Sequence, residues 1–222
     1  MSDQHQMPSP SPAAAWTRLI EGNARFVGGD TRRPHQDPSR RTSVSQGQAP
    51  FAVVLGCMDS RVPVEIVFDQ GLGDLAVVRT AGHAVDNGVL GSLEFGVSAL
   101  GAALVVVLGH DACGAVRATV NAHRTGVLPP GFVRSVVEHV NTSIVGALTG
   151  GASVDEADPD ALGEIHVQRT VHLIAERSPM IGAALAAGTC AVVGAVYNLT
   201  TGEVRVVEAV GPVAPAVTGT AG

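Results

Sequence analysis

The chain has 222 residues, of which 45% are hydrophobic and 15% are charged, and its formal net charge at pH 7 is −6. This length and apolar content are enough for one sizeable core, so we expect a single domain. The acidic balance argues against a nucleic-acid-binding or membrane-binding surface, since either needs an excess of Lys and Arg. The expected partners are a small molecule or another protein.

The two ends of the sequence differ in composition from the rest. Residues 1–12 are rich in Pro and Ser and residues 211–222 read GPVAPAVTGTAG, so we expect flexible tails around one domain over residues 13–210. The first residues lack the basic and apolar segments of a secretion signal, and no apolar run approaches the ~20 residues that span a bilayer. The three cysteines fit a reducing compartment better than a disulfide framework. The sequence therefore predicts a cytoplasmic protein.

Helical and extended patterns alternate between these tails. The predicted strands are continuous apolar runs rich in β-branched residues, as expected for strands covered on both faces, and the predicted helices have apolar residues at helical spacing. In chain order we expect a helix at 13–27, strands at 51–56 and 75–79, a helix at 86–100, a strand at 102–108, helices at 131–147 and 163–176, and a strand at 190–197. The last strand is followed by turn residues Thr201 and Gly202 and a second apolar stretch, which predicts a closing hairpin.

This alternation predicts an α/β fold with a mostly parallel central sheet, of about four parallel strands and an antiparallel edge strand, flanked by helices. In an open parallel sheet, ligands bind beyond the carboxyl ends of the strands. Two segments rich in reactive side chains lie there: CMDSR at 57–61 follows the first strand, and HDAC at 110–113 follows the third.

Cys57, His110 and Cys113 form a candidate metal site. His110 and Cys113 are three residues apart where a strand becomes a helix, so they share one face of the first turn. Two thiolates and one imidazole suit Zn²⁺, whose catalytic sites typically have three protein ligands and a fourth position for water. A purely structural zinc site is the alternative.

Asp59 and Arg61 lie beside this candidate site. Asp59 is two residues from Cys57 in an extended run, so both side chains point to the same side. If Asp59 also binds zinc, the site is closed with four ligands; if Arg61 grips the carboxylate, the fourth position opens for water. In the open arrangement we expect Asp59 to accept a hydrogen bond from zinc-bound hydroxide. Because two thiolates offset the zinc charge, bound water should be less acidic than the ~7 of a His₃ site, so activity should rise at alkaline pH.

The other cysteine and histidines have plainer interpretations. Cys190 lies inside an apolar run with no polar partner, so we read it as a small hydrophobic residue. The histidines on loops or amphipathic helices are read as structural or solvated: His83, His123, His139, His166 and His172.

The CMDSR and HDAC motifs resemble the signature of the β-class carbonic anhydrases, C-x-D-S-R followed by H-x-x-C. The likeness extends through EGNARF, FDQGLGDLAVVRTAGH and GVLGSLEFGV, and its flanks look most like the actinobacterial (mycobacterial-like) branch. The resemblance implies zinc on Cys57, His110 and Cys113, with Asp59 and Arg61 as the catalytic dyad. The implied reaction is the reversible hydration of CO₂ to bicarbonate and a proton.

The resemblance also implies a homodimer or a dimer of dimers, in which a projecting N-terminal helix around Trp16 packs on the neighbouring protomer. Gln48 matches a glutamine whose amide binds substrate across the interface, and backbone amides near Gly82 should face the site. Ala76 and Phe95 stand where many relatives carry a phenylalanine and a tyrosine of the substrate pocket, so they should lower the rate. The alternative is that both are routine core substitutions.

Some members of the family have a closed zinc site and a nearby inhibitory bicarbonate site. The tryptophan of that inhibitory site is Val54 here, whereas Arg79 and Tyr197 match two of its further residues. Together with Gln48, this favours the open form at neutral and alkaline pH, with Asp59 as a possible fourth ligand at lower pH.

Two other functions remain open on the sequence alone. The same zinc site could hydrolyse carbon disulfide or carbonyl sulfide, or the chain could be a non-catalytic, zinc-stabilised dimer that senses bicarbonate.

Overall fold

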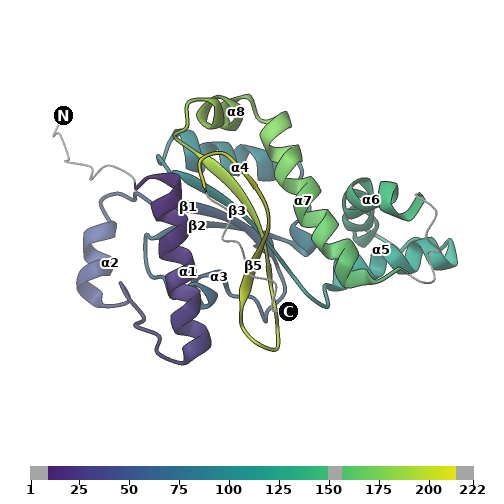
Figure 1. The fold of residues 1–222 in the computed structure, drawn as a ribbon, viewed down its shortest axis with the longest axis horizontal. Coiled ribbons are helices and arrows are strands. Elements are labelled where there is room, and N and C mark those ends of the chain that lie inside the picture. Colours follow the sequence, from purple (N-terminus) through teal and green to yellow (C-terminus); the bar gives the residue numbers. More distant parts are fainter. Residues whose placement is uncertain (1–9, 150–156, 214–222) are drawn as a thin grey trace, which may run out of the picture.

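The sheet at the centre of the molecule has five strands. In this computed structural model, which describes residues 10–149 and 157–213, they are β1 (Ala52–Cys57), β2 (Leu75–Thr80), β3 (Leu104–His110), β4 (Ala191–Tyr197) and β5 (Val204–Val210). Their order is β2-β1-β3-β4-β5, with parallel pairing from β2 to β4 and antiparallel pairing between β4 and β5. Figure 1 shows this sheet with helices on both sides of it. The predicted α/β class, the mostly parallel sheet and the antiparallel edge strand are therefore confirmed.

The helices surround this sheet. They are α1 (Pro12–Gly28), α2 (Pro38–Val44), α3 (Val64–Val67), α4 (Asn87–Ser98), α5 (Gly114–Thr125), α6 (Val133–Thr149), α7 (Pro159–Arg177) and α8 (Pro179–Ala186), with a 3₁₀ turn η1 (Ala81–His83). The four predicted helices correspond to α1, α4, α6 and α7. None of the helices in the two described stretches is long and apolar enough to cross a membrane. Most of the two predicted tails, 1–9 and 214–222, lies outside the described residues.

Two apolar layers cover the two faces of the sheet. Side chains alternate along each strand, so Val54 and Val106 pack in the layer under α1, whereas Val53 and Val105 pack in the layer under α4, α7 and α8. All six residues of β1 and all seven of β3 are buried. This explains why these strands read as continuous apolar runs.

Helix α1 docks on the sheet of its own chain. Trp16 is only 4% exposed and belongs to the core under α1. The predicted contact of this helix with a neighbouring protomer concerns a second copy and stays a prediction. Asn23 fixes the helix further along: its amide nitrogen donates to the carbonyl oxygens of Val67 at 3.1 Å and Gly202 at 2.8 Å, and its side-chain oxygen accepts from the Val204 N–H at 2.9 Å.

The Gly22→Ala substitution should loosen this docking. A Cβ at Gly22 would lie 1.9 Å from the carbonyl oxygen of Phe68, so the helix would have to shift away from α3. We expect the free energy of unfolding, measured by urea denaturation, to fall by about 1–3 kcal/mol. The matched control is Gly28→Ala in the same helix, where the nearest atom to a Cβ is 3.7 Å away, and which should change stability by less than about 0.5 kcal/mol. Equal stability of the two variants would contradict this account of the docking.

Candidate metal centre

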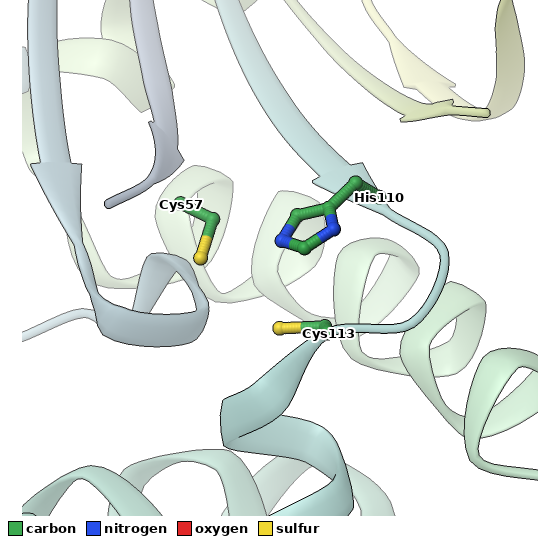
Figure 2. A group of neighbouring side chains, drawn as sticks. All are labelled: Cys57, His110 and Cys113. Atoms are coloured by element: carbon green, nitrogen blue, oxygen red, sulfur yellow. The ribbon is translucent and has the colours of Figure 1, made fainter. Parts of the chain in front are cut away.

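Three segments bring the predicted metal ligands together. Cys57 is the last residue of β1, His110 is the last residue of β3, and Cys113 immediately precedes α5. Because β1 and β3 are neighbouring parallel strands, their carboxyl ends meet at the same edge of the sheet. The two sulfur atoms and a ring nitrogen of His110 all lie within 4.8 Å of one another, and all three residues are buried. Figure 2 shows the three side chains converging on one small space.

The hydrogen bonding of His110 leaves one ring nitrogen available for a metal. Nδ1 lies 2.7 Å from the carbonyl oxygen of Asp111, which only accepts hydrogen bonds, so Nδ1 carries the proton. Nε2 is buried and has no hydrogen-bond partner among the described residues. An unprotonated imidazole nitrogen whose ring is oriented by a carbonyl at the other nitrogen is the usual form of a histidine metal ligand. The buried Nε2 therefore fits a metal ion.

The two thiols differ in acidity because they lie against each other. The neighbouring Cys113 thiol and His110 ring, helped by the backbone N–H groups of Asp59 and Gly82, lower the pKa of Cys57 well below its usual range in spite of its burial. The same pairing, together with burial, raises the pKa of Cys113 well above its usual range. A divalent cation between the sulfur atoms would stabilise both thiolates. Two thiolates and one imidazole form a donor set that suits zinc.

Asp59 lies beside the cluster and is held by Arg61. The Arg61 guanidinium donates from Nε to Oδ1 at 2.9 Å and from Nη2 to Oδ2 at 2.7 Å, and the Arg61 backbone N–H also donates to Oδ1 at 2.9 Å. These hydrogen bonds hold the pKa of the Asp59 carboxyl well below its usual range, so it is charged at neutral and alkaline pH. Its Oδ2 is 3.9 Å from Nε2 of His110. The carboxylate thus borders the cluster while both of its oxygens are engaged by arginine.

Arg79 on β2 also shapes the site. Its Nε donates to the carbonyl oxygen of Cys57 at 2.9 Å and its Nη2 donates to that of Asp59 at 2.6 Å. These bonds fix the backbone that carries the first sulfur and the carboxylate. This role could not be predicted from the sequence, because it depends on the register that pairs Arg79 with Gly56 of β1. The sequence offered two signals, the match of Arg79 to a residue of the inhibitory site and its place near the end of an adjacent strand, and neither predicts these hydrogen bonds.

Gly82 lies in the turn after β2 and contacts the cluster directly. Its backbone N–H donates to Sγ of Cys57 at 3.3 Å. Gly82 has φ +61°, and a Cβ on it would lie 2.6 Å from Cβ of Ala115 in α5. A residue other than glycine would therefore be strained here and would also meet α5.

The other three predicted substrate-binding residues, Gln48, Ala76 and Phe95, lie elsewhere in the chain. Gln48 is exposed and precedes β1, whereas Cys57 ends that strand. Ala76 of β2 and Phe95 of α4 border a shared cavity of about 420 Å³, and Phe95 is 59% exposed. Within one chain, these three residues do not belong to the cluster.

Zinc binding should depend on Cys113 and be independent of Cys190. Cys113→Ser replaces a sulfur ligand with a weakly acidic hydroxyl, so zinc content should fall from about one ion per chain to a small fraction. Cys190→Ser is the matched control, because Cys190 is also buried but lies outside the cluster. Elemental analysis of dialysed protein measures both. Full zinc in the Cys113→Ser variant would show that this cluster is not the zinc site.

Comparisons with known proteins agree with this geometry. Residues 52–204 match the family model described as carbonic anhydrase. A carbonic anhydrase of Mycolicibacterium smegmatis is 52% identical over 200 residues, which cover 90% of this chain and 95% of that protein. Carbonic anhydrase 2 of Mycobacterium tuberculosis is 48% identical over 198 residues, or 89% of this chain and 93% of that protein.

Solved structures extend the comparison to the fold. A Coccomyxa β-carbonic anhydrase in complex with acetazolamide superposes with a TM-score of 0.68 and 28% identity, over 87% of this chain and 86% of that one. A tetrameric β-carbonic anhydrase from Sordaria macrospora shares the fold, with a TM-score of 0.64 and 20% identity over 87% of this chain and 96% of that one. The chain therefore belongs to the carbonic anhydrase family, in its β class, and Cys57, His110 and Cys113 match the zinc ligands of that class.

Proposed function

We propose that this carbonic anhydrase hydrates CO₂ reversibly at an open zinc site, with Asp59 as the catalytic hydrogen-bond acceptor and Arg61 as the residue that positions it. The observation that carries the proposal is the bidentate Arg61–Asp59 pair, with contacts of 2.9 and 2.7 Å. The pair borders the cluster, and Asp59 is not one of its three members. A carboxylate gripped in this way is kept from serving as a fourth ligand.

Zinc bound by this cluster would supply a Lewis acid that lowers the pKa of water and so makes it a nucleophile. The protein then has to orient that nucleophile toward the carbon of CO₂. Asp59 can do so because a charged carboxylate oxygen accepts a hydrogen bond from the attacking group and thereby directs its lone pair. Both oxygens of Asp59 already accept hydrogen bonds from Arg61. Asp59 is therefore an acceptor of fixed orientation, and the released proton passes to solvent or buffer.

A second copy of the chain would complete the substrate pocket. Gln48, Ala76 and Phe95 lie away from the cluster of their own chain, and Gln48 and Phe95 are exposed. Strand β2 is an edge strand, and its side chains are only partly covered. We infer a homodimer, or a dimer of dimers, in which Gln48 of one copy reaches the metal centre of the other. Ala76 and Phe95 would line the apolar side of the same pocket.

Replacing Asp59 tests the catalytic assignment. Asp59→Asn keeps the size of the side chain but removes its charge and half of its acceptor capacity, so turnover in CO₂ hydration should fall by about 10²-fold or more. Zinc content should remain unchanged. Asp86→Asn serves as the control, because Asp86 caps α4 and asparagine caps a helix equally well. Wild-type turnover in the Asp59→Asn variant would contradict the assignment.

Mixed dimers test whether Gln48 acts across the interface. A Gln48→Ala chain keeps its own Asp59, and an Asp59→Asn chain keeps its own Gln48, so a heterodimer contains one complete site. Random pairing in a coexpressed sample should restore about a quarter of the wild-type sites. Turnover of the mixture should therefore exceed the average of the two separate variants. A mixture that equals that average would place Gln48 outside the neighbouring site.

A further inference from the structure

His83 and His166 form a buried pair behind the metal centre. Each is 2% exposed, and their rings stack with centroids 4.2 Å apart and an interplanar angle of 23°. We expected these histidines to be either structural or solvated; both are buried, so neither is solvated. Burying two imidazoles carries a cost in free energy unless they make compensating contacts. What each ring contacts distinguishes their roles.

His166 on α7 holds the turn that contains Gly82. Its Nε2 lies 2.8 Å from the carbonyl oxygen of Gly82. Burial lowers the pKa of His166 to about 4, although the Gly82 carbonyl opposes this, so the ring is neutral at neutral pH. Because the carbonyl can only accept, the proton of the neutral ring lies on Nε2. Nδ1 has no hydrogen-bond partner within residues 10–149 and 157–213.

Gly82 links His166 to the metal ligand Cys57 through two hydrogen bonds. While its carbonyl accepts from His166, its own N–H donates to Sγ of Cys57 at 3.3 Å. Glycine has several accessible backbone conformations, so its left-handed geometry of φ 61° and ψ 30° has to be held by its surroundings. The hydrogen bond from His166 and the stacking on His83 supply that restraint from the side of α7.

We propose that His166 is a positioning residue of the metal centre, which fixes the Gly82 N–H on the Cys57 sulfur and so sets how that sulfur binds zinc. Hydrogen bonds to metal ligands orient them and tune their electron donation, and losing one typically costs about 10–100-fold in metal affinity. The inference rests on zinc binding at this cluster. It does not depend on the proposed roles of Asp59, Arg61 or Gln48.

His83 has a different role from His166. Both of its ring nitrogens are buried without a hydrogen-bond partner among the described residues. Among the residues that the structure describes, its aromatic contact is the stacking on His166. An aromatic ring without nitrogen can preserve that stacking, so His83→Phe should bind zinc as the wild type does.

The decisive comparison uses two substitutions at His166, to Gln and to Met, whose side chains have the same length. His166→Gln keeps an N–H donor near the position of Nε2, whereas His166→Met removes the donor and keeps the bulk. Zinc affinity, measured by competition with a chelator, should fall about 10-fold or more for His166→Met and stay within about 3-fold for His166→Gln. The sulfur-to-cobalt absorption band of Co²⁺-substituted protein should shift only for His166→Met. His172→Met, on the exposed side of the same helix, is the control.

Several results would overturn the proposal. A folded His166→Met variant with wild-type affinity and an unshifted cobalt band would do so, as would equal losses in the Gln and Met variants. If His166→Met does not fold, nitrogen NMR of the wild-type zinc protein decides, because the proposal requires a proton on Nε2 of His166 that is hydrogen-bonded to the Gly82 carbonyl. A ring whose Nε2 carries no proton contradicts it. None of these readouts is CO₂ hydration, so a failure here and a failure of the proposed catalytic roles are distinguishable.

Discussion

The parallel pairing of β1 with β3 is the constraint on which the site depends. It brings Cys57 and His110, which are far apart in sequence, to adjacent strand ends. The chain then turns directly into α5, so Cys113 reaches the same space. A shift of one residue in this register would turn one ligand to the other face of the sheet. The apolar layers that fix the register therefore also fix the geometry of the metal centre.

Charge balance explains why the neighbouring arginines matter. Two thiolates cancel the charge of a zinc ion, and the Asp59 carboxylate is cancelled by Arg61. The immediate surroundings of the metal would thus be close to neutral, which suits an uncharged substrate and the release of an anionic product. Arg79 donates hydrogen bonds to the carbonyl groups of Cys57 and Asp59, so it stabilises the backbone of the site.

Features that depend on short segments of the chain could be predicted from the sequence, whereas features that depend on tertiary contacts could not. The strands and the metal ligands could be predicted because apolar runs and ligand spacing are properties of short segments. The contributions of Arg79 and His166 could not, since they arise from strand register and from the packing of α7 on η1. The contact of the Trp16 helix with a second copy also stays a prediction, because an apolar helix face does not reveal which chains cover it. The short helices α2, α3 and α8 are too brief for a clear periodicity. The roles of Gln48, Ala76 and Phe95 concern a second copy and stay predictions.

The most direct test of this account is stopped-flow CO₂ hydration by protein of measured zinc content, across about pH 6.5 to 9. The account predicts turnover at about one zinc ion per chain, rising with pH because two thiolates leave the metal a weaker acid than a His₃ site does. Absence of turnover at every pH in fully zinc-loaded protein would contradict it.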